Sequence, residues 1–361
     1  MKYTKLFVTG LFFIPILMVL SCQPQDPDNV IVLPPSPVDS TRTLKAVATY
    51  PIGAALNISK MKTSDAYTTL VKNEFSTITA ENAMKPEAIS PGRDRYNWTD
   101  ADFFVDFAQE NGLRIHGHCL VWHRAVPAWI TNFNGTEEDW MLILQNYITA
   151  VVGRYKGRVA SWDVVNEALL DNGTVREESI WYKKLGWKYV ELAFRYAHEA
   201  DPDAVLFYND YGQEYSAVKL AAINDTVMSL VRRGVPVHGI GLQMHTNINQ
   251  TSDRLITAIN ETKNTGLKVH VSELDVAINP NTVTGYVASD NDLRLQRIRY
   301  RSVTAAMRLV PDEQNWGVTT WGVSDADSWL RNNPDFPLLF DSNLQKKDCY
   351  FGVHEAFDAE L

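Results

Sequence analysis

The chain has 361 residues, of which 45% are hydrophobic and 21% are charged. This composition excludes a disordered, collagen-like or disulfide-framework protein. The 34 Lys and Arg residues are outnumbered by 43 Asp and Glu residues, which gives a formal net charge of -9. Nucleic acid is therefore not an expected partner, because binding its phosphates needs a basic run that the chain lacks. The ten tryptophans fit either a core or a set of flat platforms for sugar rings.

Residues 1–21 are typical of a secretory signal peptide. Lys2 and Lys5 precede an apolar stretch that runs from Leu6 to Leu20 and is short for a membrane span. Cys22 follows a small residue, and this arrangement resembles the lipobox of bacterial lipoproteins, in which the cysteine is lipidated. We therefore expect an exported, membrane-anchored lipoprotein on the periplasmic or cell-surface side. Simple cleavage without lipidation and a buried Cys22 remain alternatives.

Residues 22–44 are rich in Pro, Asp and Ser, which predicts a tether between the membrane anchor and a folded domain. The domain is expected to span residues 45–361. Its two cysteines, Cys119 and Cys349, are far apart in the sequence. They could pair in an oxidising compartment, but two scattered cysteines in a long chain favour buried free thiols.

The domain alternates short apolar strands with longer segments of helical period. Strands are predicted at residues 51–56, 75–80, 114–120, 161–166, 205–209, 237–243, 268–272 and 316–321. Helices are predicted at residues 101–111, 138–155, 181–200, 215–233, 252–265 and 292–309, among others. Nearly continuous apolar strands are typical of a parallel sheet that is buried on both faces. Eight such units predict a single α/β domain with the fold of a (β/α)8 TIM barrel.

Polar or aromatic residues follow almost every predicted strand. In a barrel of this kind the carboxyl ends of the strands build the active site. Stability alone gives no reason for such residues at these positions. The strand ends carry Glu81, Asn82, Lys85, His118, Trp122, His123, Asn166, Glu167, Asn209, Asp210, Gln243, His245, Glu273, Asp275 and Trp321.

Two of these residues, Glu167 and Glu273, stand directly after the fourth and seventh strands. Strands four and seven face each other across the mouth of a closed barrel. Two carboxyl groups on either side of a bond are what hydrolysis of a glycosidic bond requires, with one acting as an acid and the other ionised. A single Glu after a strand is more often an ion-pair partner or a helix cap, but the pair favours catalysis.

The neighbours of the two glutamates suggest a role for each. Asp163 is expected to point into the barrel, where its charge would raise the pKa of Glu167 and suit that residue to be the general acid. Asp275 is expected to hold His245, which could donate to Glu273 and keep it ionised as the nucleophile. Asn166 is placed to bind the 2-hydroxyl of a sugar.

A metal site is the alternative from another class of protein. His116 and His118 form an HxH pair that could join His245 and His270 around a metal ion. Barrel metallohydrolases normally carry this pair on the first strand, whereas here it lies on the third. We therefore expect no metal and no cofactor, and we interpret His116 and His270 as core residues or as residues behind the site.

The strand-end motifs resemble those of family 10 glycoside hydrolases, the retaining endo-β-1,4-xylanases. The resemblance covers roughly residues 46–357. It rests on TAENAMK (79–85), GHCLVWH (117–123), WDVVNEA (162–168), YNDY (208–211), GIGLQMH (239–245), VSELDV (271–276) and TTWGVSDADSWL (319–330).

The resemblance implies that Glu167 is the acid/base and Glu273 the nucleophile. It further implies sugar contacts from Glu81, Asn82, Lys85, His118, Trp122, Asn166, Tyr211, Gln243, His245, Trp321 and Trp329. The implied ligands are xylan and xylo-oligosaccharides. Retention of configuration would place the two carboxyl groups about 5 Å apart. Activity on β-1,4-glucans, and capture of xylan without cleavage, remain alternatives, and we expect a monomer.

Two motifs depart from the family pattern on the glycone side of the site. Pro86 follows Lys85 where the family commonly has Trp, and Arg124 and Ala125 replace a small polar residue and a Gln. Ala125 cannot make the hydrogen bond of that Gln and leaves space beside it. The glycone subsites are therefore expected to be roomier than usual.

Overall fold

Leu44, the last residue of the predicted tether, already belongs to the folded domain. The computed structural model of the chain describes residues 39, 41–331 and 335–358. The predicted signal peptide, Cys22 and most of the tether lie outside these residues. Leu44 is fully buried, and its backbone N–H donates to the Glu74 carboxylate at 2.8 Å. The packed domain therefore starts at or before Leu44.

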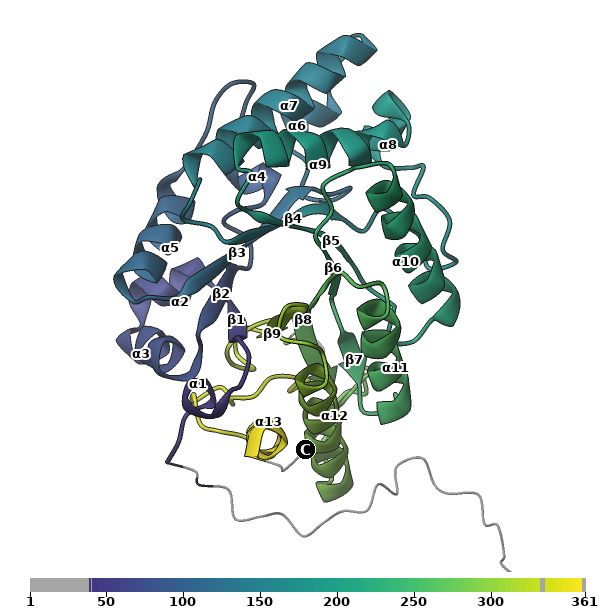
Figure 1. Ribbon diagram of the computed structural model, residues 1–361. Coiled ribbons are helices and arrows are strands. Elements are labelled where there is room, and N and C mark those ends of the chain that lie inside the picture. The colour runs from purple at the N-terminus through teal and green to yellow at the C-terminus, as the bar shows by residue number, and fades with distance from the viewer. Residues whose placement is uncertain (1–38, 40, 332–334, 359–361) are drawn as a thin grey trace, which may run out of the picture.

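Eight parallel strands close into a barrel, with helices around its outside (Figure 1). The barrel strands are β1 Ile52–Leu56, β2 Thr77–Ala80, β3 Arg114–Val121, β4 Ser161–Asn166, β5 Val205–Asp210, β6 Gly239–Leu242, β8 Lys268–Ala277 and β9 Asn315–Thr320. Closure comes from the pairing of β1 with β9 and of β6 with β8. Almost every strand residue is buried, as expected where one face packs on the barrel interior and the other on helices. The predicted (β/α)8 fold is confirmed.

A short additional strand, β7 His245–Asn247, lies outside the sequence prediction. It pairs in parallel with the second half of β8, which continues to Ala277 rather than ending at Ser272. The register of this pairing sets His245 directly opposite Asp275. The extra strand therefore determines how these two residues meet.

The helices follow the predicted segments, with one clear difference. The described helices are α1 Leu44–Val47, α2 Ile58–Thr63, α3 Asp65–Glu74, α4 Pro86–Ile89, α5 Thr99–Glu110, α6 Ala128–Thr131, α7 Glu137–Arg154, α8 Ile180–Leu185, α9 Lys188–Ala200, α10 Ala217–Arg232, α11 Ser252–Lys263, α12 Asp290–Arg308 and α13 Asp348–Asp358. The single helix predicted over residues 181–200 is broken into α8 and α9. Gly186 causes the break, because its φ of 60° and ψ of -165° form a backbone conformation that is essentially confined to glycine and cannot continue a helix.

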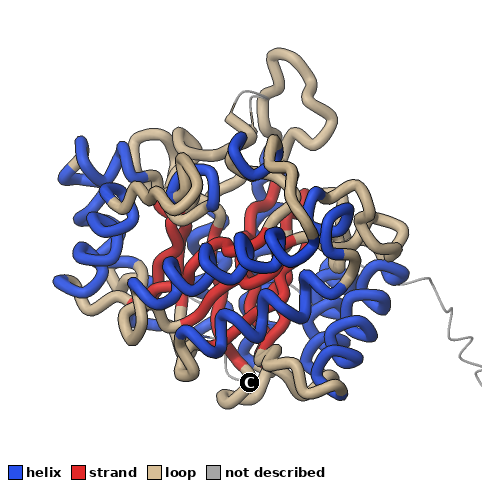
Figure 2. Tube along the Cα trace, turned by 90° about the horizontal axis from the view of Figure 1, so that it is seen from above, coloured by secondary structure: helices blue, strands red, loops and turns tan. Residues whose placement is uncertain are grey.

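The strands form the inside of the molecule, and the connecting loops gather at its two ends (Figure 2). Helices α12 and α13 pack together, and Arg297 of α12 bonds to Glu355 of α13 at 2.6 Å. Cys119 and Cys349 are both buried free thiols, as the sequence favoured. Within the part of the chain that the structure describes, no helix combines the length and the apolar character needed to cross a membrane.

Candidate active site

Glu273 lies inside β8 with only 4% of its surface exposed. Its carboxylate accepts hydrogen bonds from Asn209 Nδ2 at 2.8 Å and from His245 Nε2 at 3.2 Å. His118 Nδ1 lies 3.8 Å away. Burial pushes the pKa of Glu273 upward, but attraction to His118 and His245 outweighs it and lowers the pKa below the usual value. Glu273 is therefore suited to be ionised when substrate binds.

His245 connects Glu273 to a second carboxylate. Its Nδ1 lies 2.9 Å from Asp275 Oδ2, and its Nε2 lies on Glu273, so the contact expected from the sequence is present. Burial opposes the charge on the ring, yet the two carboxylates raise the pKa of His245 well above its usual value. A protonated ring donates from both nitrogens. Trp329 Nε1 also donates to Asp275, at 2.8 Å, and so fixes the Asp275 end of this series of hydrogen bonds.

Glu167 follows β4 and has a different environment. Gln243 Nε2 donates to its Oε1 at 3.1 Å, and Asn166 Nδ2 does so at 3.4 Å. His123 Nδ1 is 3.8 Å from Oε2. Burial lowers the pKa of His123 to about 4, so its ring is neutral near pH 7. Neutral groups thus contact the Glu167 carboxyl, whereas a charged imidazolium contacts Glu273.

Asn209, a strand-end residue to which the sequence analysis assigned no role, joins the surroundings of the two glutamates. It is the last residue but one of β5 and is fully buried. Its Nδ2 donates to Asn166 Oδ1 at 2.9 Å as well as to Glu273, and its Oδ1 accepts from Ser272 at 2.7 Å. Its backbone carbonyl accepts from the N–H of Glu167. The available signal was its position as a polar residue at a strand end.

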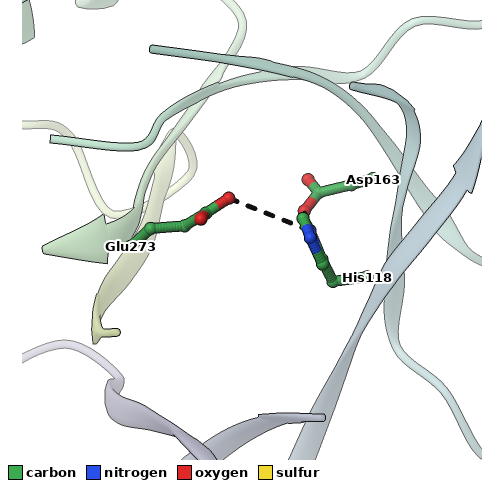
Figure 3. Close-up of side chains that lie close together, drawn as sticks. All are labelled: His118, Asp163 and Glu273. Atoms are coloured by element: carbon green, nitrogen blue, oxygen red, sulfur yellow. Dashed lines mark hydrogen bonds and ion pairs between the residues drawn. The ribbon is translucent and has the colours of Figure 1, made fainter. Parts of the chain in front are cut away.

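Asp163 contacts two histidines, which differs from the role expected for it. His118 Nδ1 lies 2.9 Å from its Oδ2, and His116 Nε2 lies 2.9 Å from its Oδ1. These histidines hold the pKa of Asp163 well below its usual range, although burial opposes this. Asp163 was expected to raise the pKa of Glu167, but its contacts are with the two histidines and not with Glu167. Asp163 instead acts on His118, which faces Glu273 across the barrel (Figure 3).

His118, Asp163 and Glu273 are also the residues best placed to ligate a metal ion. Each offers one ligand atom, and these atoms lie within 4.8 Å of one another. In this arrangement His118 Nδ1 already faces Asp163, so an ion-paired network accounts for the cluster. His270 lies elsewhere, with Nε2 2.9 Å from Thr319 Oγ1 and its ring packed on His116. Both of these rings are buried in the core, as expected.

One side of the site brings together a lysine and two tryptophans. Lys85 Nζ donates to Asn82 Oδ1 at 2.9 Å and lies 5.2 Å from the ring centroid of Trp122 and 5.8 Å from that of Trp321. Nearby Glu81 is largely buried, which raises its pKa, while Lys85 acts against the rise. Hydroxyl-binding groups and aromatic faces thus meet beside Glu273, as a sugar-binding site requires.

On the other side, Tyr211 follows β5. Its hydroxyl accepts a hydrogen bond from Arg176 at 3.2 Å, and Lys219 Nζ lies 3.2 Å from its ring centroid. Sequence reasoning selected Tyr211 but missed Arg176 and Lys219, and it gave no role to His123, which it placed at the end of the third strand. Neither cation stands at a strand end, so no local signal marked them.

The fold and this site define a (β/α)8-barrel hydrolase with two glutamates on different strands and polar side chains between them. The sequence pattern of glycosyl hydrolase family 10 matches residues 41–356. The chain belongs to that family.

Several relatives are similar over most of this chain. Endo-1,4-beta-xylanase B of Thermotoga neapolitana is 36% identical, covering 85% of this chain and 88% of its own length. Endo-1,4-beta-xylanase B of Paenibacillus barcinonensis is 37% identical, with 84% and 94% covered. The exoglucanase XynX of Acetivibrio thermocellus is 37% identical, but this chain spans only 28% of its length. The chain likewise spans 26% and 56% of two further curated xylanases.

Solved structures agree with the barrel. Native xylanase 10B from Thermotoga maritima superposes with a TM-score of 0.81 at 36% identity, covering 88% of this chain and 98% of that one. A xylanase of Thermoanaerobacterium saccharolyticum, solved as a mutant in complex with xylotriose, gives the same TM-score and identity with 87% and 99% covered.

Proposed function

We propose that the chain is an endo-1,4-β-xylanase that hydrolyses internal β-1,4-xylosidic bonds of xylan and xylo-oligosaccharides with retention of configuration. The observation that carries the proposal is the pair Glu167 and Glu273, linked through Asn166, Asn209 and Gln243 but held in different electrostatic environments. The endo-1,4-beta-xylanase relatives support xylan as the polymer.

In the first step Glu273 attacks the anomeric carbon and Glu167 gives a proton to the leaving glycosidic oxygen. A covalent glycosyl-enzyme results. In the second step Glu167 takes a proton from water, which displaces Glu273 from the same face that the leaving sugar left. Two inversions at one carbon leave its configuration unchanged, and no group other than water is consumed.

The contacts favour this division of roles. Glu273 accepts from a protonated imidazole and from the Asn209 amide, which keep it anionic and ready to attack. The side chain of Glu167 is 12% exposed against 5% for Glu273, so water has easier access to the acid/base than to the nucleophile. Asn166 lies between them and is suited to hold the sugar 2-hydroxyl.

Two alanine variants test the roles. Glu167→Ala should lose turnover of xylan but still form the glycosyl-enzyme from aryl xylobiosides with good leaving groups, and azide should rescue it to a β-glycosyl azide. Glu273→Ala should give an α-azide where azide rescues it. Nuclear magnetic resonance of the products distinguishes the anomers. Reversed anomers would exchange the roles, and full xylanase activity in both variants would overturn the proposal.

Substrate choice is tested by release of reducing sugar from xylan, carboxymethyl cellulose and mannan. Xylan should be cleaved best, and a preference for cellulose would favour the glucanase alternative. Binding of xylan without any product would favour a capture protein.

The glycone side is proposed to be roomier than usual because of Ala125. The ratio of aryl β-cellobioside hydrolysis to aryl β-xylobioside hydrolysis should therefore be raised in the wild type, and it should fall in Ala125→Gln.

We also propose that the chain is exported and anchored to a membrane through lipidated Cys22, and that it acts as a monomer. Support for the anchor comes from the sequence of residues 1–22. The anchor proposal fails if wild type and Cys22→Ser distribute alike between the membrane and soluble fractions of cells. The proposal of a monomer fails if the mass measured in solution exceeds that of one chain.

A further inference from the structure

Arg176 lies under the loop that carries Glu167, with 9% of its surface exposed. Its Nε donates to the backbone carbonyl of Glu167 at 2.9 Å, and one terminal nitrogen donates to the carbonyl of Leu169 at 3.1 Å. The same nitrogen donates to the Tyr211 hydroxyl at 3.2 Å, and the other pairs with Glu178 at 3.1 Å. One guanidinium therefore contacts both the segment of Glu167 and that of Tyr211.

The backbone at Glu167 needs such support. Its φ of 58° is left-handed, which costs a residue with a side chain about 1–2 kcal/mol. Backbone hydrogen bonds close the following loop, among them Arg176 N–H to the carbonyl of Ala168 and Leu170 N–H to that of Thr174, together with an antiparallel bridge between Leu169 and Val175. The N–H of Glu167 itself donates to the carbonyl of Asn209 on β5. Only the Arg176 side chain binds the Glu167 carbonyl among the hydrogen bonds of the described residues.

Tyr211 is held from two sides. Lys219, which is fully buried and paired with Asp210 at 3.0 Å, lies against its ring, and Arg176 binds its hydroxyl. Burial disfavours the charge of Arg176, but the bonds to Tyr211 and Glu178 outweigh it and raise its pKa. The guanidinium is therefore a permanently charged link between the loop of Glu167 and that of Tyr211.

We propose that Arg176 is a positioning residue that couples the proton donor to the leaving-group side of the site by holding Glu167 and Tyr211 in one fixed geometry. The inference rests on the proposed function of Glu167. Arg176 touches neither the bond that breaks nor the nucleophile. Its effect should therefore appear only where leaving-group protonation and leaving-side sugar contacts matter.

Two substrates separate these effects. Cleavage of xylotetraose needs both protonation and sugar contacts, whereas dinitrophenyl β-xylobioside has a leaving group that needs neither. In Arg176→Gln, kcat/KM for xylotetraose should fall about 100-fold, while kcat/KM for the aryl substrate should change by about threefold or less. Arg176→Lys keeps the charge but not the fork of donors and should show a smaller loss of the same kind. An equal fall on both substrates in the folded variants, or no fall, overturns the proposal.

Tyr211→Phe tests the coupling itself. It removes the hydroxyl bound by Arg176 and leaves the ring over Lys219. Tyr211→Phe should lower kcat/KM for xylotetraose by a smaller factor in the Arg176→Lys variant than in the wild type. Strictly additive losses would mean that Arg176 does not act through Tyr211, which overturns the coupling. Arg195→Gln, which removes a half-exposed arginine paired with Glu191 on α9, should leave both substrates unaffected.

The proposed function has its own readout in this experiment. In Glu167→Ala, kcat/KM for xylotetraose should again fall much more than kcat/KM for the aryl substrate, and by a larger factor than in the Arg176 variants. If it does not, Glu167 is not the acid, and both proposals fail. If Glu167→Ala shows the difference and the Arg176 variants do not, only the role of Arg176 is overturned. Should Arg176→Gln not fold, as judged by circular dichroism, Arg176→Lys and Tyr211→Phe decide the question.

Discussion

At the residue scale, the two glutamates differ through the charge of their neighbours. His245 is charged because Asp275 and Glu273 flank it, and its charge in turn favours the ionised form of Glu273. The sequence placed these three residues correctly relative to one another, because each lies within a few positions of a strand end. It could not place Asp163, whose partners His116 and His118 depend on the register between β3 and β4.

Removing the charge of His245 should change the pH dependence of catalysis. In His245→Asn, Glu273 loses a charged donor, so its pKa should rise toward and beyond the ordinary value. Because the ionised form is the active one, the acidic limb of kcat/KM should move to higher pH, by about one unit. Measurement of kcat/KM for an aryl xylobioside across pH checks this. Trp329→Phe, which removes only a donor to Asp275, should shift the limb less. An unmoved limb in His245→Asn would contradict the assignment.

At the element scale, backbone conformation decided what periodicity could not. Residues 181–200 have helical spacing throughout, yet Gly186 interrupts them with a backbone conformation that suits only glycine. Likewise β7 was too short and too polar to be recognised as a strand, although its pairing with β8 sets His245 against Asp275. The break depends on the conformation of a single residue, and the strand depends on a partner strand that is distant in the sequence; hydrophobic spacing reports neither.

Two glycine-to-alanine variants should have opposite effects on stability. Gly186→Ala places a side chain on a residue whose φ of 60° and ψ of -165° suit only glycine, with no atom within 4 Å of the new Cβ, so strain alone should lower the free energy of unfolding by about 1–3 kcal/mol. Gly153→Ala, inside α7 and equally free of close atoms, should raise it by up to about 1 kcal/mol. Urea unfolding measures both. Equal effects would show that the backbone at Gly186 is not strained by alanine.

At the scale of the whole molecule, the ends of the described chain meet at Glu74. This buried residue of α3 accepts from Leu44 N–H and from Tyr350 of α13, each at 2.8 Å, and lies 3.5 Å from Lys346 Nζ. It thereby ties the first and last helices of the barrel together. No local pattern indicates this contact, since its partners are far away in the sequence.

Glu74→Ala should destabilise the barrel without changing its chemistry. Two buried donors lose their acceptor, so the free energy of unfolding should fall by about 3 kcal/mol. Below the unfolding transition, kcat on xylan should remain at the wild-type value. Thermal and urea unfolding, together with the xylanase assay, check both halves. The exposed Glu110 of α5 provides the control, because Glu110→Ala should change stability by about 0.5 kcal/mol or less. A stable Glu74→Ala variant would contradict the prediction.

The barrel and the positions of Glu167 and Glu273 follow from the order of residues alone. Burial on both faces leaves continuous apolar strands, and the polar residue that ends each strand must lie at one mouth of the barrel. The bridge through Asn209, the pairing of Asp163 with two histidines and the reach of Arg176 from Glu167 to Tyr211 were decided only by the tertiary structure. These contacts join side chains from different strands and loops, and their distances depend on strand register and loop path, which no local pattern records.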